Sequence, residues 1–240
     1  MKWVPDATGR FSERPHYEPH ELDSECEAMV ESFLLNRHGE IRYPISTGDL
    51  ILMLEKYSDS LDLYADLGHP DIWGETLFVA GKKPKVKIAK ILSENERFEN
   101  PLRTTITHEF SHIHLHGFLF EMKGSEKNLF TSQGSMHGKP SVCRRTQIQS
   151  PAIYDWLEWQ AAYASGALLI PKRSVQNVVQ DYRSRLQIKV DAIEIGTREG
   201  SQLVEDVSKC FRVSKEAAEV RLAKLGYVVR ESNGQRRLWS

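Results

Sequence analysis

The stretch Thr107-His108-Glu109-Phe110-Ser111-His112 contains the pattern H-E-x-x-H. On an α-helix, side chains four residues apart project from the same face on successive turns, so both imidazoles can reach one ion. Two such histidines can take two corners of a tetrahedral zinc site. Glu109 stands where it can take a proton from a water molecule activated by that ion. The motif therefore predicts zinc ligation by His108 and His112, with Glu109 as the general base.

The residues around the motif predict a helix of about 16 residues that holds the two histidines in register. Asn100-Pro101 is a favourable helix start, with Asn as the N-cap and Pro at the first helical position. Gly117 is the expected stop. The following segment, residues 118–150, is polar and lacks a sustained period. We expect it to be a long loop of the kind that often serves function.

Catalytic zinc usually has three protein ligands, so a third is needed. His116 lies one turn beyond His112, but it is about 12 Å along the helix axis from His108, and three ligands in one column do not enclose an ion well. Glu158 is favoured, because it lies in a second apolar helix predicted over residues 151–171, where a buried acid needs a partner. Asp155 remains an alternative ligand. Asp155, Tyr154 and Tyr163 are otherwise expected to lie around the ligands.

The rest of the first 171 residues predicts helices and a small antiparallel sheet. Residues 1–18 carry no periodic apolar pattern and are expected to form a flexible tail, not a signal peptide. Helical spacing begins at Pro19, and Ser46-Thr47 can cap a second helix. Strands are expected near Leu61–Tyr64, Thr76–Ala80 and Val86–Ile91. The lysines of the last strand suggest a sheet edge, where an extended substrate could pair.

Charge is unevenly distributed along the chain. Residues 1–171 hold 18 Lys and Arg against 24 Asp and Glu, whereas residues 172–240 hold 14 against 9. The three cysteines are far apart, which fits a reducing cytoplasm, and no apolar run is long enough for a membrane span. The basic segment 172–240 is predicted to be helical. Its Val213-Ser214 and Leu225-Gly226 delimit a helix that completes a helix-turn-helix-like unit.

Three motifs together resemble the ImmA/IrrE family of zinc metallopeptidases. They are Arg103–His112 around H-E-x-x-H, Glu158-Trp159-Gln160-Ala161 leading to Leu168-Leu169-Ile170-Pro171, and Val213-Ser214 leading to Arg221–Gly226. The resemblance covers about residues 20–228. It implies an α+β, gluzincin-like (zincin-like) fold: a metallopeptidase domain over 19–171 and a helical, helix-turn-helix-like domain over 172–240. It also implies that His108, His112 and Glu158 bind zinc and Glu109 is the base. One departure is Ala162, where the family usually has Asn.

The resemblance further implies a cytoplasmic endopeptidase that cleaves a regulatory protein. The expected substrate is a helix-turn-helix repressor of a mobile element or stress regulon. For the basic segment, packing or partner recognition is favoured over direct DNA binding, because nothing from Phe211 to Gly226 singles out base-contacting residues. No membrane partner is expected. The alternative is a non-proteolytic regulator that binds DNA or protein and uses zinc for structure.

Overall fold

A computed structural model of the 240-residue chain describes residues 1–79, 81–130, 141–144 and 155–230. Side chains are described at all of these positions except 123–130 and 141–144. The fold class is α+β. The chain divides into two compact units, Met1–Leu169 and Ile170–Ser240, where the sequence predicts a boundary after Pro171. In the described part of the chain, helices fall short of the length and apolar character that crossing a membrane requires.

The N-terminal residues form a hairpin, so the prediction of a flexible tail over residues 1–18 was wrong. Strands β1 (Lys2–Pro5) and β2 (Glu13–His16) pair antiparallel. Between them, the Asp6 carboxylate accepts hydrogen bonds from the backbone and hydroxyl of Thr8 and from the backbone N–H of Phe11. It also accepts one from the indole of Trp156. A single buried acid thus fastens a segment that has little apolar periodicity.

The two helices expected next are confirmed. Helix α1 (Pro19–His38) begins with a proline in its first turn and ends at Gly39, which has a left-handed φ of 75°. The backbone N–H of Gly39 bonds to the Leu35 carbonyl and so caps the last turn. Helix α2 (Thr47–Tyr57) begins at Ser46, whose hydroxyl accepts from the Asp49 backbone N–H.

The sheet next to the H-E-x-x-H helix is mixed, with strand order β3-β5-β4-β6. Its strands are β3 (Ser60–Ala65), β4 (Ile72–Leu77), β5 (Lys85–Ala89) and β6 (Ser141–Arg144). Strand β3 runs parallel to β5, and β4 runs antiparallel to β5 and β6, so the wholly antiparallel sheet was a wrong prediction. The edge position of the lysine-bearing strand was also wrong. Its lysines alternate with buried residues because one face of a central strand is exposed.

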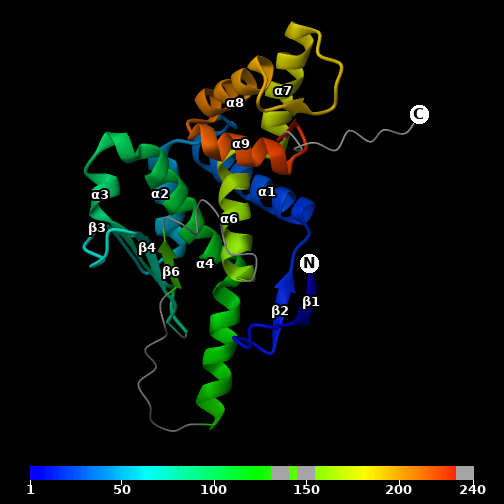
Figure 1. Cartoon of the computed structure of the whole chain (residues 1–240). Coiled ribbons are helices and arrows are strands. Elements are labelled where there is room, and N and C mark those ends of the chain that lie inside the picture. Colours follow the sequence, from blue (N-terminus) through cyan, green and yellow to red (C-terminus); the bar gives the residue numbers. More distant parts are fainter. Residues whose placement is uncertain (80, 131–140, 145–154, 231–240) are drawn as a thin grey trace. The chain divides into compact units, whose positions relative to one another are not determined.

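Helix α4 (Glu99–Phe130) carries the H-E-x-x-H motif and continues well past Gly117, the predicted stop. A short helix α3 (Lys90–Ser93) and a 3₁₀ turn (Glu96–Phe98) lead into it. Beyond Gly117, Leu119 is buried against Trp156 and Leu157, and this packing outweighs the glycine's weak helix propensity. Part of the predicted loop over 118–150 is therefore helix, and another part is β6. Helix α4 packs between the sheet and α6 (Trp156–Leu169) (Figure 1).

The described residues of the unit Ile170–Ser240, 170–230, form the helices α7 (Lys172–Leu186), α8 (Arg198–Phe211) and α9 (Lys215–Lys224). Strands β7 (Ile193–Glu194) and β8 (Val228–Val229) pair in parallel. Helices α8 and α9 pack together and are joined by residues 212–214. Ser214 caps α9 by accepting from the Ala217 backbone, as its position before the helix predicts. The buried Arg221 donates to the Ile170 carbonyl.

Candidate metal centre

The turns of α4 around the motif are rich in threonine and serine. Their hydroxyl groups form hydrogen bonds within the helix. Each hydroxyl donates to the backbone carbonyl four residues earlier, at 2.7–3.0 Å. These residues are Thr104, Thr105, Thr107 and Ser111. Side chains of this kind can be buried without leaving a polar group unpaired. They allow a polar sequence to form a helix in the protein interior.

The same hydroxyls bring α6 close to α4. The Thr107 and Ser165 hydroxyls are 2.7 Å apart, and the Ser165 hydroxyl lies 3.2 Å from the Thr104 carbonyl. Glu158 lies seven residues, or two turns, before Ser165, so both project from one face of α6. The contact at Ser165 thereby directs the Glu158 carboxylate towards the motif histidines.

His108, His112 and Glu158 converge as a group that could hold a metal ion. The two Nε2 atoms are 3.1 Å apart, Nε2 of His108 is 3.2 Å from one Glu158 oxygen, and Nε2 of His112 is 3.4 Å from the other. Tetrahedral zinc with ligands at about 2.0–2.2 Å has donor atoms about 3.3–3.6 Å apart, close to the separations found here. The donor set and its spacing therefore fit a tetrahedral ion. Glu158 occupies the predicted third position.

Burial and charge both suit a cation at this place. The three residues are only 0%, 1% and 5% exposed. Burial raises the pKa of Glu158, but the charge on His112 and hydrogen bonds from both histidines outweigh burial and hold that pKa well below its ordinary value. Burial lowers the pKa of His108, whereas for His112 the opposing effect of Glu158 prevails and raises the pKa. The result is an ionised carboxylate facing two imidazoles in a water-poor interior.

Glu109 is fixed against strand β4. It is fully buried, and one carboxylate oxygen, Oε2, accepts a hydrogen bond from the Thr76 hydroxyl. Gly74 stands opposite the other oxygen: a Cβ added there would lie 2.4 Å from Oε1. The absence of a side chain at Gly74 thus creates the room that the carboxylate occupies. The charge of Glu109 is also one of the smaller contributions to the raised pKa of His112.

His116 lies outside the ligand group, as the spacing along the helix predicts. Its Nδ1 is 3.1 Å from Nδ1 of His112, on the side of that ring opposite the ligand nitrogen. Its Nε2 is 3.0 Å from the amide oxygen of Gln160, on α6. Burial, with the charge of His112, holds the pKa of His116 well below its ordinary value.

The residues expected around the ligands have other hydrogen-bond partners. Asp155 forms a two-fold ion pair with Arg10, at 2.6 and 2.8 Å. The Tyr163 hydroxyl donates to Asp23 on α1 at 3.2 Å. Neither of these interactions involves a histidine of the group. Tyr154 lies outside the described residues.

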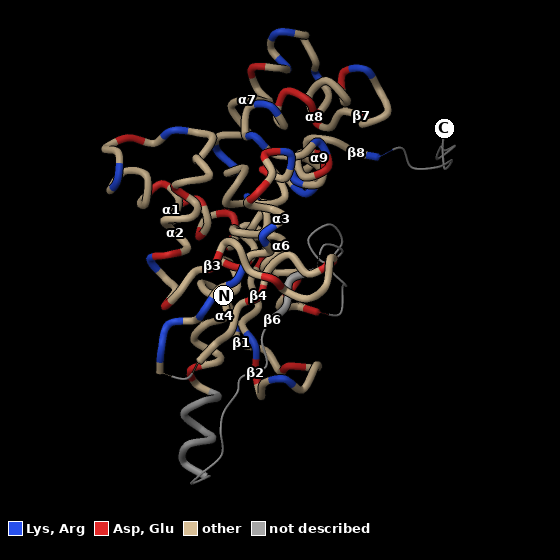
Figure 2. The backbone as a smooth tube through the Cα atoms, turned by 90° about the vertical axis from the view of Figure 1, so that its left-hand side faces the viewer, with Lys and Arg blue, Asp and Glu red and all other residues tan. Residues whose placement is uncertain are grey.

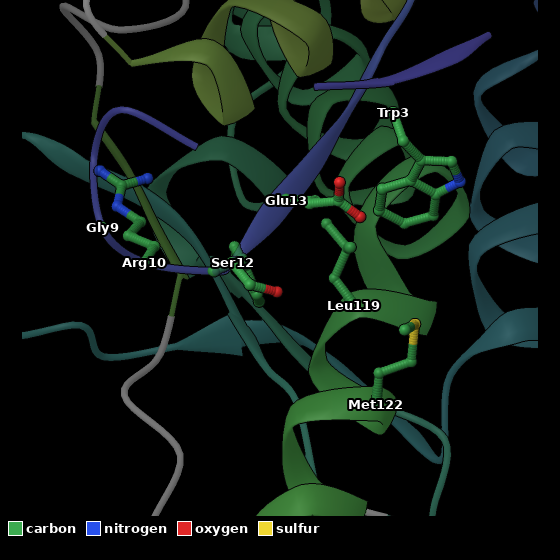
Figure 3. A pocket seen from close by; sticks show the side chains of 8 residues that line it. Trp3, Gly9, Arg10, Ser12, Glu13, Leu119 and Met122 are labelled. Atoms are coloured by element: carbon green, nitrogen blue, oxygen red, sulfur yellow. The ribbon is translucent and has the colours of Figure 1, made fainter. Parts of the chain in front are cut away.

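A pocket of about 470 Å³ lies between the N-terminal hairpin and the later turns of α4 (Figure 3). Trp3, Arg10 and Glu13 come from the hairpin side, and Leu119 and Met122 from the helix. The three candidate metal ligands do not line it. This pocket is therefore separate from the metal centre.

Sequence reasoning missed four residues near the centre: Gly74, Thr76, His116 as a partner of His112, and Gln160. Gly74 lies within β4 but outside the strand predicted over Thr76–Ala80, so the signal of a glycine within a strand, which often marks a close approach by another group, was not available from the sequence. The resemblance leads one to expect an Asn at position 162, where this chain has Ala162. Gln160, two residues earlier, supplies an amide that contacts His116. Thr76 had no local signal, because its contact with Glu109 joins residues 33 apart in sequence.

Comparison of the sequence with protein-family models gives no match, and comparison with curated proteins gives none either.

Proposed function

We propose that this protein is a zinc-dependent endopeptidase. The observation that carries the proposal is the convergence of His108, His112 and Glu158 on one point, with Glu109 adjacent on the same helix. Two imidazoles and one carboxylate form a donor set that catalytic zinc uses, with one position left for substrate or water. The proposed fold is accordingly a zincin-like core built from the sheet, α4 and α6. Zinc bound there would supply Lewis-acid polarisation of a scissile carbonyl and acidify a water molecule.

In this proposal the chain's own residues do the proton transfer. Glu109 accepts a proton from the attacking water and delivers it to the leaving amine. The hydroxyl of Thr76 orients the carboxylate from one side, and the backbone at Gly74 limits its movement from the other. Positioning of this kind matters because general acid–base catalysis contributes about 10²–10⁴-fold in rate.

The proposed substrate is a cytoplasmic regulatory protein, namely a helix-turn-helix repressor of a mobile element or stress regulon. This part rests on the resemblance of the three motifs to ImmA/IrrE metallopeptidases. For residues 172–240 we propose partner recognition or packing in preference to DNA binding. Figure 2 shows acidic residues interleaved with the basic ones along α8. Glu205 binds both Lys209 and Lys215, which reduces the local excess of positive charge.

The experiment combines one variant with two measurements. Purified protein loaded with zinc is incubated with the regulator encoded beside its gene, and products are identified by mass spectrometry. Glu109→Gln should retain zinc while cleavage falls by about 10²–10⁴-fold, because the base is lost and the ligands are kept. Glu121→Gln, an exposed position on the same helix, is the matched control and should cleave normally. Full cleavage by Glu109→Gln would refute the proposal.

A non-proteolytic regulator with a structural metal is the second candidate, and the burial of the ligand group favours it. Structural zinc sites are closed, and here the ligands are at most 5% exposed. On this alternative, the Glu109→Gln protein relieves repression as well as the original protein does. An intact regulator together with cleaved short peptides would instead identify a peptidase for small peptides.

A further inference from the structure

A chain of hydrogen bonds runs from the N-terminal hairpin to a candidate metal ligand. The Gln160 amide nitrogen is 2.8 Å from the carbonyl oxygen of Pro15 in β2. The Gln160 amide oxygen is 3.0 Å from Nε2 of His116, and Nδ1 of His116 is 3.1 Å from Nδ1 of His112. Three contacts therefore connect Pro15 to the ring of His112.

The direction of this chain follows from its starting point. A carbonyl can only accept, so the amide nitrogen of Gln160 must face Pro15 and its oxygen must face His116. An amide oxygen can only accept, so the proton of His116 is on Nε2. A hydrogen bond between two Nδ1 atoms needs one acceptor, and because the His116 proton is on Nε2, its Nδ1 accepts and Nδ1 of His112 donates. The remaining nitrogen of His112, Nε2, faces His108 and Glu158 and is the atom that would offer its lone pair to an ion bound in place of a proton.

The surroundings hold this arrangement in place. His116 is fully buried, and His112 and Gln160 are each 1% exposed, so bulk water does not compete for these hydrogen bonds. The indole of Trp156 contacts the His116 ring edge-on, with centroids 5.6 Å apart at 88°. Trp156 is itself bound by Asp6, in the loop of the same hairpin that supplies Pro15.

The two motif histidines differ in this respect. Nδ1 of His108 is buried, and within the described part of the chain no hydrogen-bond partner reaches it. Of the two motif histidines, His112 is therefore the one whose Nδ1 has a hydrogen-bond partner among the described residues, and that partner determines which nitrogen carries the proton. A ligand histidine whose other nitrogen donates a hydrogen bond is better oriented and more basic towards the metal.

We infer that Pro15, Gln160 and His116 form a positioning relay that fixes His112 as the Nδ1–H tautomer and turns its Nε2 lone pair towards the metal. The inference rests on the proposed metal site but not on peptidase activity. It gives His116 and Gln160 a role as positioning residues. It also makes metal affinity depend on the N-terminal hairpin.

The first test measures zinc affinity by competition with a chromophoric chelator. His116→Phe keeps the ring shape but removes both nitrogens, and Gln160→Met keeps the length but removes the amide. Each should weaken zinc binding about 10–100-fold, the usual effect of losing a residue that supports a ligand. His116→Asn restores an acceptor where Nδ1 stands and should recover most of the affinity. His114→Phe is the control: that neighbouring histidine bonds to Glu25 and should leave affinity unchanged.

The second test reads the His116 tautomer directly, by ¹H–¹⁵N correlation NMR of the imidazoles with and without zinc. The relay requires the Nε2–H form in both states. An Nδ1–H form, or His116→Phe affinity equal to that of the unaltered protein, would overturn the inference. These readouts do not use cleavage. A protein that binds zinc and shows the expected tautomer but cleaves nothing would refute the proposed function and leave the relay supported.

Discussion

Replacing Gly74 with alanine tests how Glu109 is positioned. The added Cβ would meet three atoms of the Glu109 side chain: Oε1 at 2.4 Å, Cδ at 2.9 Å and Cγ at 3.0 Å. An unstrained carbon–oxygen contact is about 3.3 Å or more, so the carboxylate must move by roughly 1 Å. Glu109 is fully buried and bonded to Thr76, so it cannot swing into solvent to relieve the clash.

The displacement sets the expected magnitudes. A catalytic group moved by about 1 Å loses roughly 10²-fold in rate. Overpacking of a buried site costs about 1–3 kcal/mol of the free energy of unfolding. The metal ligands are not touched, so zinc affinity should change by only a few-fold. The combination of lost rate and kept metal distinguishes this variant from one that damages the ligands.

The assay compares cleavage rate, zinc content and urea unfolding for Gly74→Ala and a control. Gly117→Ala is suited as the control, because its Cβ would meet only a Phe78 ring carbon, at an ordinary 3.8 Å. Gly117 lies within α4, so alanine there should add about 0.5–1 kcal/mol of stability. If Gly74→Ala cleaves at the full rate and unfolds at the original urea concentration, the positioning of Glu109 by β4 is refuted.

Three further predictions concern the metal, the hairpin and β6. Removing zinc that is present at 100 times its dissociation constant should lower the free energy of unfolding by about 2.7 kcal/mol. At about 2–4 °C per kcal/mol, the Tm measured by calorimetry should fall by about 5–11 °C. An unchanged Tm would contradict a metal linked to the native fold. Asp6→Ala should cost about 1–3 kcal/mol at pH 7. Burial raises the Asp6 pKa, but the hydrogen bonds from Thr8, Phe11 and Trp156 outweigh burial and lower it. The stabilisation by the ionised Asp6 is therefore complete above the unfolded pKa of about 3.9. It is lost as pH falls through the native pKa. Urea unfolding of both proteins across pH 2–7 should show the difference narrowing at acid pH, and a constant difference would refute it. Val142→Pro should weaken the pairing of β6 with β4 and raise the cleavage rate several-fold; an unchanged rate would show that β6 does not limit access.

The predictable part of the centre is the part encoded by short-range spacing. The four-residue interval between His108 and His112 fixes their common helix face, and Glu158 stood out as an acid in an apolar helix. Helix caps such as Ser46 and Ser214 were predictable for the same reason, because each cap bonds to a backbone N–H three residues ahead.

The parts that escaped prediction depend on contacts between distant residues. Gly117 favours a helix end locally, yet the burial of Leu119 against Trp156 and Leu157 carries α4 onward. The alternating lysines of β5 are compatible with an edge or with a half-exposed central strand, and strand order decides between them. The N-terminal hairpin is held by the polar contacts of Asp6, which leave no hydrophobic period in the sequence.

The pairing of β6 with β4 has a consequence for selectivity. Strand β4 carries Gly74 and Thr76, which hold Glu109, and its outer edge is occupied by β6 of the same chain. A peptide that adds to this edge must compete with a strand of the same chain, and such an intramolecular competitor acts at a high effective concentration. A short peptide that makes no other contact with the protein is at a disadvantage in such a competition. A folded regulator that also binds elsewhere on the protein raises the local concentration of its own segment at the edge of β4 and can displace β6. Under the proposed function, the occupied edge would therefore favour a docked protein substrate over a free peptide.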